Sequence, residues 1–196
     1  MSIRSLKKLF SIYIQAMFVQ TLNTPNPNSL KFLPGEKVSL SGAVEFTKKD
    51  ETSNELIRNI LSINGVVGIF LSEDFLSVNK EEKKEWEEIK HIIISFINEF
   101  YSEGNKYVYE SSTSQNEDIN LDEIEKKIIK ILDTKIRPAV ARDGGDIKFK
   151  EYKDGKVKVE MRGSCSGCPS STMTLKQGVE NLLKHYIPEV TEVITV

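Results

Sequence analysis

The sequence predicts an α+β protein made of two small mixed α/β domains joined by a flexible linker. Its hydrophobic residues recur at strand spacing in some segments and at helical spacing in others, and its 196 residues suffice for two small domains. Residues 110–118 (ESSTSQNED) carry no aliphatic or aromatic side chain that a core could bury. We therefore expect an extension at 1–16, an N-terminal domain at 17–104, a linker at 105–118 and a C-terminal domain at 119–196.

The N-terminal domain shows short strand-like segments followed by amphipathic helices. Between the first two strands, TPNPNS (24–29) is dense in turn-forming residues. This turn serves either to fix the local backbone or to contact a partner, and the sequence does not separate the two. The elements expected in order are strands at 18–22 and 30–33, a helix at 51–64, a hairpin at 66–79 turning at Glu73 and Asp74, and a helix at 85–100.

The sequence predicts that the helices and strands of the C-terminal domain follow the order α-β-β-α-β. Asn120 and Glu123 form a candidate capping pair for a first helix that runs to Arg137 and Pro138. Asp154-Gly155 predicts a tight hairpin turn because both residues tolerate positive φ angles. The remaining expected elements are hairpin strands at 146–152 and 156–162, a helix at 175–186 and a strand at 190–196, with a cysteine-containing loop before the second helix.

The composition excludes two classes of function. The net charge is −2, and neither half has the basic excess typical of a nucleic-acid-binding protein. No hydrophobic run approaches the roughly 20 residues that span a bilayer. Residues 1–16 are basic and lack acidic side chains, which is typical of a mitochondrial presequence; an upstream start codon, with the folded protein beginning near Met17, explains them equally well.

Residues 163–171, GSCSGCPSS, contain both cysteines of the chain, Cys165 and Cys168. A lone pair at this spacing in a chain with so few cysteines indicates a metal or redox site in a reducing compartment. Thiol–disulfide exchange, a zinc site and an iron–sulfur cluster each use such a pair, and the last two need about four ligands. Two incidental cysteines are the remaining interpretation.

The loop chemistry favours the cluster. Ser164, Ser166 and Gly167 are small, so main-chain N–H groups can approach inorganic sulfide, and Pro169 follows the second cysteine as in ferredoxin motifs. A helix that begins just after the loop, capped by Ser170 or Ser171, would favour an anionic cluster at its N-terminus.

The number of ligands then predicts the quaternary structure. Cys165 and Cys168 supply two of the four ligands, and we expect His91 and His185 to lie far from the loop, as surface or packing residues. The other two thiolates should come from a second copy of the chain in a symmetric homodimer. A cluster held between two subunits is released more easily than one enclosed in a single chain, which suits a carrier.

Several segments resemble the NifU-like family of iron–sulfur scaffold proteins, called Nfu. In the C-terminal domain these are RPAVARDGGDI (137–147), GSCSGCPSSTMTLKQGVENLL (163–183) and IPEV (187–190). FVQTLNTPNPNSLKFLPG (18–35) is similar to the start of the N-terminal domain of mitochondrial and α-proteobacterial members. Within the first segment, the residues from Arg142 to Asp146 match a family signature, and we interpret them as a structural turn.

The resemblance implies a binding protein, not an enzyme, located in the mitochondrial matrix or the bacterial cytoplasm. It implies that Cys165 and Cys168 bind a [4Fe-4S] cluster, with [2Fe-2S] as the alternative, shared between two chains. The partners implied are upstream assembly proteins as donors and apo iron–sulfur proteins as recipients. A thiol–disulfide oxidoreductase is the alternative function; a hairpin directly before the loop, in place of a βαβ unit, argues against it.

Overall fold

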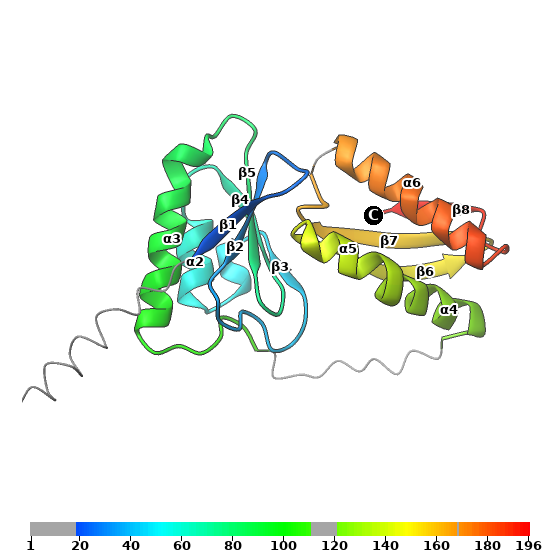
Figure 1. Cartoon of the computed structure of the whole chain (residues 1–196), viewed down its shortest axis with the longest axis horizontal. Helices are drawn as coiled ribbons and strands as arrows, with labels where there is room; N and C mark the ends of the chain where they lie inside the picture. Colours follow the sequence, from blue (N-terminus) through cyan, green and yellow to red (C-terminus); the bar gives the residue numbers. More distant parts are fainter. Residues whose placement is uncertain (1–18, 111–120, 168) are drawn as a thin grey trace, which may run out of the picture.

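The computed structural model describes residues 19–110, 121–167 and 169–196, and for 169–171 the backbone only. The N-terminal domain is an antiparallel sheet of five strands in the order β1-β2-β5-β4-β3, with helices α2 and α3 on one face (Figure 1). The predicted extension 1–16 lies outside the described residues. The elements are β1 Gln20–Asn23, β2 Ser29–Leu33, β3 Val44–Phe46, a 3-10 turn Lys49–Glu51, α2 Glu55–Leu61, β4 Val66–Leu71, β5 Leu76–Lys80 and α3 Trp86–Ser102.

The N-terminal core lies between the helices and one face of the sheet. Helix α2 begins where Asn54 Oδ1 accepts a hydrogen bond from the Ile57 N–H at 3.1 Å. Helix α3 turns Ile89, Ile93 and Ile97 toward the sheet, and all three are buried. The predicted strands, the 66–79 hairpin and both helices are thus confirmed, although the helix expected at 51–64 is shorter.

Two features of this domain differ from the prediction. Strand β3 was not predicted, because three residues are too short to show an alternating pattern. In the segment assigned to the linker, Val108 is buried in the N-terminal core. The Tyr109 carbonyl accepts a hydrogen bond from the Leu40 N–H at 3.0 Å. The N-terminal domain therefore continues beyond residue 104.

The C-terminal domain is a three-stranded sheet, β6-β7-β8, that shares one hydrophobic core with its helices. β6 and β7 form an antiparallel hairpin whose turn has positive φ angles at Asp154 and Gly155, as predicted. β8 pairs with β7 in parallel, and α6 connects the two. The elements are α4 Glu123–Ile131, a π-helical turn Leu132–Ile136, α5 Arg137–Arg142, β6 Gly145–Lys153, β7 Lys156–Gly163, α6 Pro169–Tyr186 and β8 Glu192–Thr195.

The first helical segment of the C-terminal domain begins and ends at other residues than the sequence predicted. Its N-cap is Asp122, whose carboxylate accepts a hydrogen bond from the Glu125 N–H at 2.7 Å. In the opposite direction the Glu125 carboxylate accepts from the Asp122 N–H at 3.1 Å. The predicted pair was wrong: Asn120 lies outside the described residues and Glu123 begins the helix. The helical path also passes Pro138, because the π-helical turn places this proline in the first turn of α5, where no N–H donor is needed.

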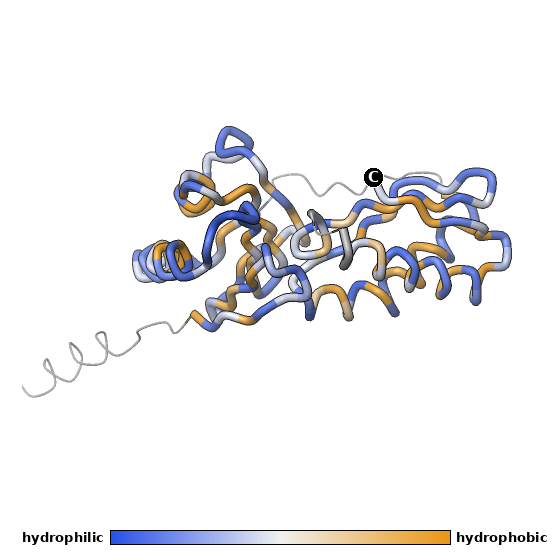
Figure 2. The backbone as a smooth tube through the Cα atoms, turned by 90° about the horizontal axis from the view of Figure 1, so that it is seen from above, coloured by the Kyte–Doolittle hydropathy of each residue, from blue (hydrophilic) through white to orange (hydrophobic). Residues whose placement is uncertain are grey.

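The two domains touch at one end of the C-terminal domain. In Figure 1 the end that carries the β7–α6 connection abuts the sheet of the N-terminal domain on the face opposite α2 and α3. Figure 2 shows hydrophobic and hydrophilic residues alternating along the elements of both domains, as expected for amphipathic strands and helices. Among the helices that the structure describes, none combines the length and hydrophobicity needed to cross a membrane.

Candidate iron–sulfur site

The cysteine loop connects the carboxyl end of β7 to the start of α6. Two positive φ angles shape it, +63° at Gly163 and +77° at Gly167, in the region that favours glycine. Cys165 lies between these glycines, and Cys168 lies outside the described residues. Helix α6 begins at Pro169, so Ser170 and Ser171 belong to its first turn and the cap predicted at either serine is wrong.

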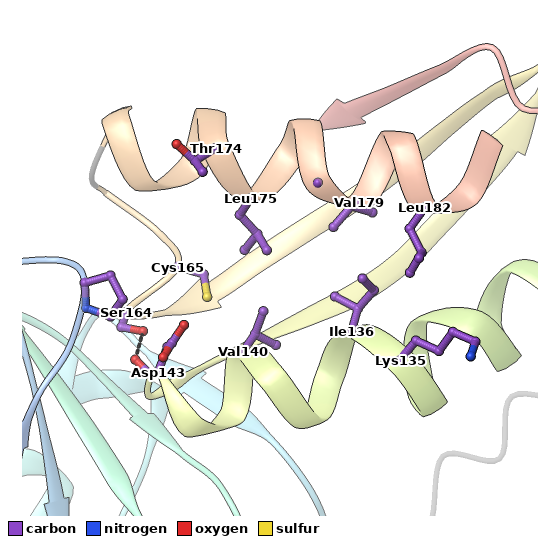
Figure 3. Close-up of a pocket in the computed structure, with 12 residues that line it drawn as sticks. Lys135, Ile136, Val140, Asp143, Ser164, Cys165, Thr174, Leu175, Val179 and Leu182 are labelled. Atoms are coloured by element: carbon purple, nitrogen blue, oxygen red, sulfur yellow. Dashed lines mark hydrogen bonds between the residues drawn. The ribbon is translucent and has the colours of Figure 1, made fainter. Parts of the chain in front are cut away.

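The Cys165 side chain points into the domain. It is 6% exposed, and Figure 3 shows its sulfur between α5 and α6, directed toward Val140 and Asp143. The Cys165 carbonyl accepts a hydrogen bond from Thr172 Oγ1 at 3.0 Å. A glycine is required at 145, because a Cβ there would overlap Cys165 Sγ and lie 2.8 Å from the Arg162 carbonyl oxygen.

A groove of about 700 Å³ runs from Cys165 between α5 and α6 (Figure 3). Ile136 and Val140 line it from one side, Leu175 and Val179 from the other. The thiol therefore faces a largely apolar space. Burial raises the pKa of Cys165 to about 11, and the nearby carboxylate of Asp143 acts in the same direction.

These observations change the case against thiol–disulfide exchange. The predicted absence of a βαβ unit is wrong, because β7, α6 and β8 form one, with the cysteine loop at its first connection. The state of the thiol supplies another argument. Exchange enzymes use an accessible cysteine of lowered pKa, whereas Cys165 is buried and its pKa is raised.

The signature from Arg142 to Asp146 covers the turn before β6 and the first two residues of that strand, and it supports the cysteine loop structurally. Arg137 binds both carboxylate oxygens of Asp146, at 2.7 and 3.2 Å. The Ser164 hydroxyl donates to the Asp143 carbonyl, and the Ser164 N–H donates to the Gly144 carbonyl at 3.2 Å. The turn interpretation thus agrees with the structure, with the loop bound to main-chain groups of the turn.

Side chains of the N-terminal domain also bind the loop, and the sequence did not indicate this. Asn26, in the proline-rich turn, is 2% exposed. Its Nδ2 donates to the carbonyl oxygens of Ser164 and Ser166, at 3.2 and 3.0 Å. The same residue fixes its own turn, because its Oδ1 accepts from the Asn28 N–H at 2.9 Å. The turn therefore fixes its own backbone and also contacts the other domain of the same chain, while the predicted contact with a partner protein stays a prediction.

The polar residues of β3 and β5 add further contacts. Asn79 Nδ2 donates to the Gly163 carbonyl at 3.0 Å, and the Glu45 carboxylate accepts from the Gly163 N–H at 3.0 Å. Ser77 Oγ donates to the Gly144 carbonyl at 2.7 Å. Burial raises the pKa of Glu45, and its bond to Gly163 opposes that shift.

The histidines lie outside this region. His91 is exposed on α3, and His185 is exposed in the last turn of α6, where its ring contacts that of Tyr186. Within the described ranges, no three side chains of His, Cys, Asp or Glu are grouped closely enough to bind a metal ion.

The fold and the loop place the chain among two-domain proteins with a cysteine pair between a hairpin and a helix. Residues 128–194 match the family described as NifU-like domain, and residues 19–104 match the family described as scaffold protein Nfu/NifU N terminal. The chain belongs to this Nfu family.

Two relatives match this chain over most of its length. The protein named NFU1 iron-sulfur cluster scaffold homolog, mitochondrial, of Drosophila persimilis is 42% identical over 191 residues, which cover 95% of this chain and 68% of the relative. The human protein of that name is 42% identical over 183 residues, 90% of this chain and 71% of the relative. The chain spans between 63% and 71% of the length of such relatives. A solution NMR structure of a NifU-like protein from Saccharomyces cerevisiae is 30% identical, covers 50% of this chain and 87% of that one, and superposes with a TM-score of 0.45.

Proposed function

We propose that this protein is an iron–sulfur cluster scaffold and carrier. It binds a [4Fe-4S] cluster through Cys165 and Cys168 of two copies of the chain and passes the cluster to apo-proteins. The observation that carries this proposal is the position of the cysteine pair, in a glycine-rich connection that ends at the start of α6, within a chain of the Nfu family.

The cysteine loop provides the ligands and the electrostatic environment for a cluster that the protein carries and passes on. Thiolates are the ligands that iron–sulfur clusters use, and the sequence places two of them three positions apart. The N-terminus of the 18-residue helix α6 follows directly and favours an anion. Because Cys165 is 6% exposed, binding between two copies requires its sulfur to turn out of the groove.

A shared cluster suits a carrier for a chemical reason. Each chain supplies two of the four thiolates, so separation of the copies, or a competing thiol of an acceptor, breaks the coordination. Proteins that need four-iron clusters are the recipients, and cluster-assembly proteins are the donors. The relatives' names favour the mitochondrial matrix as the place where this occurs.

The transfer step is tested with anaerobically reconstituted protein and an apo-enzyme that requires a four-iron cluster. We expect the enzyme to regain activity within minutes and faster than with equal amounts of free iron and sulfide. A chelator that traps free iron should leave this transfer largely intact. Activation no faster than with free iron and sulfide would contradict the carrier function, and purified protein holding only zinc would favour a structural zinc-bridged dimer.

A further inference from the structure

One face of the N-terminal sheet carries polar side chains that are nevertheless buried. Lys31 on β2 is 7% exposed, and Ser77 on β5 is fully buried. Their neighbours along the strands, Phe32 and Val78, point the other way into the N-terminal core. A polar face of this kind normally contacts water. Here the end of the C-terminal domain covers it (Figure 1).

The polar groups of this face bind main-chain atoms around the cysteine loop. Asn26 donates to the carbonyls of Ser164 and Ser166, the residues directly before and after Cys165. One side chain of the other domain therefore holds the peptide group between Ser164 and Cys165 and the peptide group that follows Ser166. A movement of the loop main chain that carries the Cys165 sulfur outward would break both of these bonds.

The start of the loop and the turn beside it are held as well. Asn79 binds the Gly163 carbonyl, and Ser77 binds the carbonyl of Gly144, which also accepts from the Ser164 N–H. Phe70, only 1% exposed, packs against Gly163 so closely that a Cβ on this glycine would lie 2.9 Å from the ring. Nearby, Lys31 Nζ donates to the Ala141 carbonyl at 2.9 Å. The contact thus combines buried hydrogen bonds with tight packing.

We propose that the N-terminal domain holds the cysteine loop in its inward conformation through the positioning residues Asn26, Ser77 and Asn79, and thereby competes with the cluster for Cys165. This inference rests on the proposed function, because it assigns regulation to the same loop. The competitor is part of the same chain, so its concentration at the loop does not depend on a partner.

The competition favours release of the cluster. A chain whose loop is held inward cannot share a cluster, and each shared cluster needs two free loops. The apparent affinity therefore falls with the square of the fraction of chains that have a free loop. Weakening the hold raises this fraction and strengthens cluster retention. The N-terminal domain would then return the emptied loop to its inward state after transfer.

The first test asks, in the absence of a cluster, whether the N-terminal domain holds the cysteine loop inward. It uses the variant Asn26→Asp. The new carboxylate keeps the oxygen that accepts from the Asn28 N–H, but it replaces the donor with an oxygen that faces two carbonyls. A Cys168→Ser background leaves Cys165 as the only thiol of the full chain. We expect its reaction with a disulfide reagent under native conditions to become about tenfold faster, the scale set by losing one or two hydrogen bonds.

The matched control is Asn59→Asp, which makes the same chemical change at an exposed position of α2, on the other side of the sheet. In the Cys168→Ser background, Cys165 of this control variant should react at the same rate as Cys165 of the Cys168→Ser protein. Trp86 fluorescence reports whether the proline-rich turn stays folded, because the indole N–H donates to the Pro27 carbonyl at 3.0 Å. If Asn26→Asp disturbs that signal, the Ser77→Ala/Asn79→Ala double variant replaces it. An unchanged thiol rate in a folded variant overturns the hold.

The competition is tested in chains with both cysteines. Wild type and Asn26→Asp are loaded with a cluster and equilibrated with the same limiting apo-acceptor. We expect the variant to retain the larger share of clusters. Equal retention overturns the competition. Failure of wild type to bind any cluster overturns the proposed function instead, and the thiol rates still decide whether the N-terminal domain holds the loop.

Discussion

Replacing either Cys165 or Cys168 by serine should abolish cluster binding. A hydroxyl does not replace a thiolate as an iron ligand in this class of site, and each substitution removes two of the four ligands from a symmetric pair of chains. After anaerobic reconstitution, we expect iron and acid-labile sulfide to fall below about a tenth of the wild-type amount. The measurement is elemental and sulfide analysis together with the visible absorption of the cluster.

The folded monomer should survive these changes. Serine is close in size to cysteine, and burying its hydroxyl at position 165 costs about 1–3 kcal/mol. Met173→Ala serves as the control, because this side chain is 70% exposed on the same helix α6 and leaves both thiols in place. A full complement of iron and sulfide in either cysteine variant would show that the ligands are assigned wrongly.

Gly145→Ala should destabilise the C-terminal domain and displace Cys165. The added Cβ would overlap Cys165 Sγ and lie 2.8 Å from the Arg162 carbonyl oxygen and 3.0 Å from the Cys165 nitrogen. Two of these atoms belong to the main chain, so the β6–β7 ladder must shift to make room. We expect a loss of about 1–3 kcal/mol in the free energy of unfolding, the usual scale of overpacking. Hydrogen exchange of the β6 and β7 amides measures it in this domain alone.

Gly178→Ala is the matched control. This glycine lies in the middle of α6 on the same groove, and a Cβ there meets no atom within 4 Å. Alanine should therefore stabilise the helix by up to about 1 kcal/mol. Equal effects of the two substitutions would contradict the packing described for Cys165, because only Gly145 lies against the sulfur.

The elements of the C-terminal domain were predictable because their signals are local. Asp154-Gly155 marks the β6–β7 turn, and the helical spacing in α6 is set by residues on one face, from Leu175 to Leu183. Strand β3 was missed because its pairing with β4 is the only feature that defines it. The cap of α4 was misplaced because Asn120 and Asp122 are both good capping residues.

The site was predictable in its chemistry and not in its geometry. The spacing of the two cysteines indicates metal chemistry without any structure. That Cys165 is buried depends on Gly145, which lies twenty residues earlier in the chain and meets the sulfur only after the hairpin forms. The role of Asn79 and Ser77 was hidden for another reason. Polar residues that alternate with core residues along a strand normally indicate a solvent-facing side, and no local pattern shows that a second domain covers it.

Native mass spectrometry of the anaerobically reconstituted protein tests the central claim most directly. The account predicts a dimer of the chain that carries one Fe4S4 unit, together with monomers that carry none, and it predicts that removing the cluster converts the dimer into monomers. A monomer that holds a complete cluster, or a dimer that persists unchanged after the cluster is removed, would contradict coordination shared between two cysteine loops.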